Sequence, residues 1–352
     1  MHNFKNTAAV TKIKALYGKK ITKNQLKYLA NCKSVSTIAT YLKNKTCYSD
    51  ILKEVDENQI HRGELEILIK KQNFNNYEKV SHYFNFDNES ILKIIINEFE
   101  MLEVLKIISL IKINKSNEYI TYLPGYLISK CNINLLQLAK AKNFSNLLNI
   151  LKNTWYYEIL KKFQPNNSDN DIIIDYTTCE YLIFKKFLKQ TFKFIEQKMN
   201  NLEKFQLKKL INLEIECLDI CNIFRKKIIF NLERSEIENN ILTLNKNLNQ
   251  NKFENLITSK NLEDFKFKLN IFLKKHNTNA KNFDVKNNYI ENYFAKLKNH
   301  IFQHLLHLSD NVSVVFYIFH KLTQIEISNL IYTIEGVRYG LLPQKIQDLL
   351  IV

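Results

Sequence analysis

The sequence predicts an all-α protein, and three observations support that fold class. Apolar residues recur at three- and four-residue steps through most of the chain, which is the period of an amphipathic helix. Only five glycines and three prolines occur in 352 residues, too few for the frequent turns of a β-sandwich or barrel. Apolar residues make up 45% of the chain, which is ample material for a core.

Long helices are predicted in three segments, at 91–112, 207–224 and 318–334, because each carries one continuous apolar stripe. In the first segment, the stripe consists of Ile91, Ile94, Ile95, Phe99, Leu102, Leu105, Ile108 and Ile111.

Breaks between helices are predicted where turn-forming or polar residues gather, at 121–125, 165–171 and 276–282. The five glycines are scattered, so a glycine-rich phosphate-binding loop is excluded.

Two motifs each return about every 110 residues, which indicates an internal repeat. The first pairs residues 25–52 with 135–160, where a Leu-Ala helix is followed by a Lys-Asn segment, a tyrosine and an acid-Ile-Leu ending. A weaker copy at 253–262 places Lys260 opposite Lys142. The second motif begins at Glu103, Glu216 and Glu326. We therefore predict three pseudo-repeated helical lobes of roughly 110 residues, with approximate boundaries at 1–120, 121–235 and 236–352.

The chain carries a formal charge of +16, but this excess is spread along its length. Nucleic-acid-binding proteins usually gather their positive charge on one face or tail, so the charge is interpreted as mostly compositional. Weak attraction to an anionic membrane surface or acidic partner is compatible with it. The first residues lack the apolar core of a signal peptide, and no apolar run approaches the ~20 residues of a membrane-spanning helix.

Metal and catalytic motifs are weak. His300, His304 and His307 share one side of a predicted helix, a spacing that can bind zinc, yet the polar flank of an amphipathic helix explains them better. Cys217 and Cys221 fit core packing, and the six cysteines show no disulfide-framework spacing.

Asp169, Asp171 and Asp175 lack the glycine and closing glutamate of a calcium loop. The aromatic residues Trp155 and Tyr156 beside Lys152 could stack nucleic-acid bases, but a core cluster is the simpler interpretation. No catalytic, cofactor-binding or metal site is predicted.

The C-terminal segment has a clear local interpretation. Gly336 and Gly340 can adopt the left-handed conformation that ends a helix, and Pro343 suits the first turn of the next one. The last helix, from Gln344, is expected to bury Ile346.

The order of these C-terminal motifs resembles the C-type family of V/A-type ATPase subunits, whose eukaryotic form is the d subunit of the V-ATPase, and it is most similar to the bacterial and archaeal branch. The resemblance extends over nearly the whole chain, through the opening helix at Lys12–Ala15 and the helices at 99–112 and 135–160. The family-motif residues are Glu326, Asn329, Leu330, Gly336, Gly340 and Pro343.

The resemblance implies a funnel-like body of three helical lobes and a non-catalytic subunit of the central rotor. Its partners would be the central-shaft subunits and the membrane ring, on the cytoplasmic face, with no span of its own, no cofactor and no nucleic acid. Two alternatives remain open. One is a stand-alone basic helical-repeat protein that binds RNA or another protein, and the other is a helical zinc enzyme using His300 to His307.

Overall fold

The computed structural model describes residues 2–83, 91–163, 175–242, 246–275 and 290–352, and every regular element within these ranges is helical. The all-α prediction is therefore confirmed. The chain divides into two compact units. Unit 1 comprises Met1–Met199 and Asp310–Leu350, and unit 2 comprises Asn200–Ser309 and Ile351–Val352. The three predicted lobes remain a prediction.

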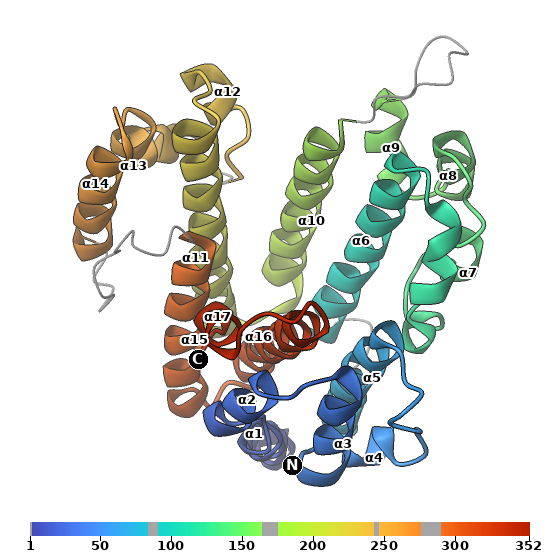
Figure 1. Cartoon of the computed structure of the whole chain (residues 1–352). Helices are drawn as coiled ribbons and strands as arrows, with labels where there is room; N and C mark the ends of the chain where they lie inside the picture. Colours follow the sequence, from blue (N-terminus) through green and yellow to red (C-terminus); the bar gives the residue numbers. More distant parts are fainter. Residues whose placement is uncertain (1, 84–90, 164–174, 243–245, 276–289) are drawn as a thin grey trace. The chain divides into compact units, whose positions relative to one another are not determined.

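Unit 1 contains most of the helices (Figure 1). Its α-helices are α1 (His2–Gly18), α2 (Lys23–Ala30), α3 (Val35–Lys45), α4 (Ser49–Leu52), α5 (Arg62–Ser81), α6 (Ile91–Lys112), α7 (Leu135–Leu138), α8 (Phe144–Ile150), α9 (Trp155–Leu160), α10 (Tyr176–Lys198), α16 (Val312–Arg338) and α17 (Pro343–Leu349). Three short 3-10 helices join them, η1 (Ser116–Tyr122), η2 (Gly125–Leu127) and η3 (Lys161–Phe163).

The predicted break at 121–125 is confirmed, because η1 ends at Tyr122 and η2 starts only at Gly125. The predicted breaks at 165–171 and 276–282 lie outside the described residues. The three long stripes form α6, α11 and α16. Leu102 is an exception within the first stripe, since its side chain is 45% exposed.

Helix α16 is the central element of unit 1. It packs against α1, α2, α3, α5, α6 and α17, while α6 and α10 lie side by side (Figure 1). Its C-terminal half joins a core in which Leu330, Ile334 and Val337 meet Ile346 of α17 and the apolar faces of α2 and α3. This helix is buried along most of its length, so any polar side chain on it requires a partner.

Unit 2 contains α11 (Asn201–Phe224), the π-helical η4 (Arg225–Ile229), α12 (Arg234–Glu238), α13 (Lys246–Ile257), α14 (Leu262–Lys275) and α15 (Ile290–Leu308). Its core is rich in aromatic side chains, and Phe253 and Phe265 are fully buried there. Asp219 on α11 is fully buried and accepts a 2.8 Å hydrogen bond from the backbone N–H of Leu242. That bond fastens the chain after α12 to the long helix.

Three helical hairpins share the same turn, at the positions that the first repeat motif aligns. In each, a lysine precedes an N-cap side chain that accepts a hydrogen bond from the backbone N–H three residues later. The cap bonds are 3.2 Å at Ser34 of α3, 2.8 Å at Asn143 of α8 and 2.9 Å at Asn261 of α14. The agreement is local and leaves the equivalence of whole lobes as a prediction.

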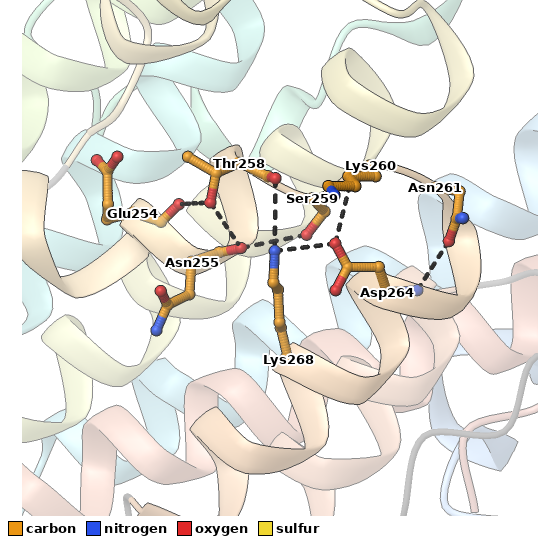
Figure 2. Close-up of polar contacts among 8 residues, drawn as sticks. All are labelled: Glu254, Asn255, Thr258, Ser259, Lys260, Asn261, Asp264 and Lys268. Atoms are coloured by element: carbon orange, nitrogen blue, oxygen red, sulfur yellow. Dashed lines mark hydrogen bonds and ion pairs between the residues drawn. The ribbon is translucent and has the colours of Figure 1, made fainter.

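The turn at Asn261 shows how such a hairpin is held (Figure 2). The Asp264 carboxylate accepts 2.9 Å hydrogen bonds from the backbone N–H of Lys260 and from Nζ of Lys268. These two donors lower the pKa of Asp264. Lys268 also reaches the Thr258 carbonyl at the end of α13, so one side chain joins both helices (Figure 2).

Candidate functional site

The polar seam of α16 is our name for three groups of charged side chains on that helix, around residues 320–324, 326 and 335. The partners of each group come from helices in the first third of the chain. In the first group, Nζ of Lys321 lies 2.9 and 3.1 Å from the two carboxylate oxygens of Glu98 on α6. Nε2 of Gln324 lies 3.2 Å from the same carboxylate.

His320 extends this first group into the core. Its side chain is fully buried, with Nε2 3.3 Å from Glu98 and Nδ1 3.0 Å from the Tyr77 hydroxyl on α5. Burial acts to raise the pKa of Glu98, but Lys321 and His320 outweigh it and hold that pKa below its usual range. The first group therefore holds an ionised carboxylate between α5, α6 and α16.

Glu326 forms the second group, one and a half turns further along α16. The Tyr48 hydroxyl donates a 2.9 Å hydrogen bond to its Oε1, and Nδ2 of Asn73 donates a 3.0 Å bond to the Tyr48 oxygen. Burial raises the pKa of Glu326 to about 7, even though the Tyr48 bond and the backbone N–H of Ile21 favour its charged form. Two glutamates on neighbouring levels of the seam thus have pKa values shifted in opposite directions.

The third group ties the end of α16 to α5. Glu335 forms an ion pair with Arg62, whose Nε also lies 3.0 Å from Glu66. Arg338 lies 3.7 Å from the second oxygen of Glu335. Burial raises the pKa of Glu66, and this effect exceeds the opposing effect of Arg62.

The turn after α16 depends on its glycines. Gly340 has a φ of +65°, and the backbone N–H groups of Gly340 and Leu341 bond back to Val337 and Gly336 at 3.1 and 2.9 Å, which is a Schellman cap. The prediction for Gly340 is confirmed, and Pro343 occupies the first turn of α17 as predicted.

Gly336 does not end the helix, so that part of the prediction was wrong. It lies inside α16, where a Cβ would come within 2.6 Å of Cγ1 of Ile346. Its missing side chain instead creates the space into which α17 packs. Ile346 is buried there, as expected.

Two further motif residues are buried in α16. Leu330 is fully buried in the core shared with α2 and α3. Asn329 is 3% exposed, and its carbonyl accepts a 2.8 Å hydrogen bond from the Thr333 hydroxyl. Five of the six motif positions thus serve the packing or the ends of α16 and α17, while Glu326 joins α16 to Tyr48.

A sequence model of the ATP synthase (C/AC39) subunit family matches residues 9–349, which is nearly the entire chain. The chain belongs to this family. Among the curated proteins, none matches its sequence. The family is the V/A-type ATPase family that the C-terminal motifs resemble, and its members are structural rather than catalytic parts of a rotary ATPase.

The metal candidates of this C/AC39 chain do not come together. His300, His304 and His307 lie on exposed positions of α15, and the described residues contain no cluster of His, Cys, Asp or Glu suited to a metal ion. Cys217 and Cys221 are buried in the core of unit 2, where burial raises the pKa of each thiol to about 12.

The remaining sequence candidates have structural positions. Asp175 accepts the cap bond of α10 from Thr178 at 3.1 Å, while Asp169 and Asp171 fall outside the described residues. Trp155 stacks on Tyr156 with ring centres 3.8 Å apart. Tyr156 is buried and its hydroxyl donates to Glu100 of α6 at 3.3 Å, so its ring is part of the core.

Sequence reasoning missed Glu98, His320, Lys321 and Arg62. A signal was present for Glu98, because it stands four residues after Ile94 and four before Leu102, within the apolar stripe. A charge in such a stripe requires a partner, but the sequence does not say which one. No helix in the described ranges combines the length and the apolar content needed to cross a bilayer.

Proposed function

We propose that the protein is the non-catalytic central-stalk component that links the shaft of a V/A-type rotary ATPase to its membrane ring. In this role it transmits torque between ATP chemistry and proton or sodium transport, and it sits peripherally on the cytoplasmic face of the membrane. The observation that carries the proposal is the family match over residues 9–349.

The polar seam supports a torque-bearing role for unit 1. A part that transmits torque must resist shear between its helices, and apolar packing alone is weakly directional. Ion pairs and hydrogen bonds with fixed geometry fix the register of neighbouring helices. In unit 1 they bind α16 to Glu98 on α6, Tyr48 beside α4 and Arg62 on α5.

Exposed apolar side chains at the end of α16 offer a contact surface for another part of the ATPase. We call this set the α16–α17 patch, and it comprises Tyr332, Tyr339, Leu341 and Leu342, each at least 41% exposed. Aromatic and aliphatic side chains of this kind dominate the binding energy of protein interfaces. The net charge of +16 suits acidic ring loops and anionic lipid as additional partners.

The proposal is tested by tagging the chain in its own cells, solubilising membranes in detergent and identifying the proteins that co-purify. We expect ATPase head, shaft and ring subunits. In a strain that lacks the gene, membranes should lose ATP-driven ion transport, and restoring the chain should recover it. Recovery of the chain alone, or unchanged ion transport without it, would contradict the proposal.

Two paired variants sharpen this test. Tyr339→Ser with Leu342→Ser removes two exposed side chains of the α16–α17 patch, and Ile113→Ser with Ile120→Ser removes two comparably exposed ones after α6. We expect the first pair to weaken co-purification of the other ATPase proteins more than the second, with similar thermal stability. Salt-dependent RNA binding by the isolated chain would instead favour the basic RNA-binding alternative.

A further inference from the structure

A cleft of about 610 Å³ opens in unit 1 between the ends of several helices. Its lining comes from the end of α1, the start of α2, the segment joining α3 to α4, and the last turns of α5. This volume lies within the range of small-molecule sites in proteins. The polar seam and the α16–α17 patch contribute no residue to this lining.

The lining is strongly basic. Lys19, Lys20, Lys45 and Lys79 line the cleft, against one carboxylate, Asp50. The four ammonium groups come from α1, α3 and α5, segments separated in sequence, so the fold gathers them. Within the described residues, none of the four lysines forms an ion pair of 4.0 Å or less with a carboxylate. The positive charge is therefore not neutralised by close ion pairs.

The cleft also offers neutral hydrogen-bonding groups. Thr22 and Ser49 bring hydroxyl groups to the lining, and Gln72 and Asn76 bring side-chain amides. Gln72 is only 5% exposed, and its Nε2 donates a 3.3 Å bond to the Cys47 carbonyl, so part of the lining is buried and fixed. Lysines with hydroxyl and amide donors are a typical environment for phosphate groups.

Lys20 adds an energetic argument. Its side chain is partly buried, and desolvation lowers its pKa despite the opposing effect of Glu326. An anion in the cleft would compensate this desolvation, so binding would stabilise the charged lysine.

We propose that this cleft binds a small phosphorylated molecule or a phosphate-bearing lipid headgroup. The proposal is independent of the rotor function, because it rests on residues in the α1–α5 part of unit 1. A simpler explanation is that the lysines only offset the helix dipoles, since each stands at or just beyond a helix C-terminus. The two explanations differ in whether an added polyanion binds.

The test uses the full chain at low ionic strength, with tripolyphosphate as the soluble probe in titration calorimetry. Phosphatidylcholine vesicles with and without phosphatidic acid form the lipid arm, followed by co-sedimentation. We expect saturable binding that weakens with added salt. Binding of tripolyphosphate assigns a free phosphorylated ligand, and binding only to phosphatidic acid vesicles assigns a headgroup. Absence of binding in both arms would overturn the proposal.

Matched variants separate the cleft from general charge attraction. Lys19→Gln, Lys45→Gln and Lys79→Gln together remove three cleft lysines, whereas Lys27→Gln, Lys53→Gln and Lys71→Gln remove three exposed lysines outside it. We expect the cleft variant to weaken binding by at least about tenfold and the control by less than about threefold. Equal weakening in both variants would overturn the proposal.

One further variant keeps every lysine. Ser49 is the first residue of α4, where an acidic side chain suits the helix dipole, so Ser49→Asp is expected to fold normally. It places a second carboxylate in the lining and should also weaken probe binding by about tenfold. Unchanged affinity in this variant would contradict the site, and a lower melting temperature without a change in affinity would support the helix-dipole explanation instead.

Discussion

The Tyr48 hydroxyl donates a 2.9 Å hydrogen bond to Oε1 of Glu326, joining two residues 278 positions apart in the sequence. Tyr48 is fully buried, and Asn73 supports its oxygen from α5. Because burial raises the pKa of Glu326 to about 7, this carboxyl changes its charge near neutral pH. The contact therefore makes the stability of the α16 packing depend on pH.

Replacing Glu326 by Gln should remove a pH dependence of stability. The pKa of Glu326 is about 7 in the folded chain against 4.5 for an unperturbed glutamate, so the folded state binds its proton more tightly. The free energy of unfolding of the wild type therefore falls as pH rises from about 4.5 to 7, by on the order of 3 kcal/mol from this group. Urea unfolding from pH 5 to 8 should show the variant gaining stability relative to the wild type.

Tyr48→Phe is the partner test for this carboxyl. The Tyr48 bond favours the charged form of Glu326, so its loss should raise the pKa of Glu326 further and move the stability change to higher pH. Parallel stability curves for the wild type and Glu326→Gln across this range would contradict the assignment.

Glu98→Gln should destabilise the chain at neutral pH by about 3 kcal/mol, because it leaves Lys321 without its carboxylate at a site where both side chains are at most 14% exposed. The pKa of Glu98 is lowered on folding, so its contribution is present above the unfolded pKa and is lost as pH falls below about 4.5. The difference between the two proteins should shrink in acid.

Glu78→Gln is the matched control, since the Glu78–Lys130 pair is 41% exposed on both sides. It should cost less than about 1 kcal/mol. Denaturant titrations at pH 7 and pH 4 measure both variants, and equal losses for the two pairs would refute a special role for Glu98.

Gly336→Ala should destabilise the packing of α17 on α16 by about 1–3 kcal/mol, because the new Cβ would lie 2.6 Å from Cγ1 of Ile346. Ile346→Ala removes the two clashing atoms, so the double variant should lose less than the sum of the single losses. Gly18→Ala is the control, with open space around its Cβ position. Additive losses in the thermal unfolding of the double variant would argue against this contact.

The shared turn predicts similar losses at three distant sites. Replacing Ser34, Asn143 or Asn261 by Ala should each cost about 1 kcal/mol, since each side chain accepts a backbone N–H at a helix start. His61 is an exposed N-cap without a side-chain cap bond, so His61→Ala should cost less than about 0.5 kcal/mol. Chemical unfolding followed by circular dichroism measures all four, and a negligible loss at one of the three caps would remove it from the set.

The candidate site could be predicted only in part. The Schellman cap at Gly340 and the helix start at Pro343 follow from local backbone preferences, and the structure has both. Gly336 was misjudged because its role is not a backbone conformation but the close approach of Ile346 from another helix. Glu326 was singled out as a motif residue, but neither its bond to Tyr48 nor its raised pKa could be foreseen.

By itself, the sequence determined that the chain is helical and where most helices begin and end, because period, capping residues and scarce glycine act over a few neighbouring positions. Its motifs also identified the C/AC39 family. Only the tertiary structure decided which partners Glu98, Glu326 and Arg62 meet and which lysines line the basic cleft. Those pairings join helices that are far apart in sequence, and the burial that shifts their pKa values exists only once the helices have packed.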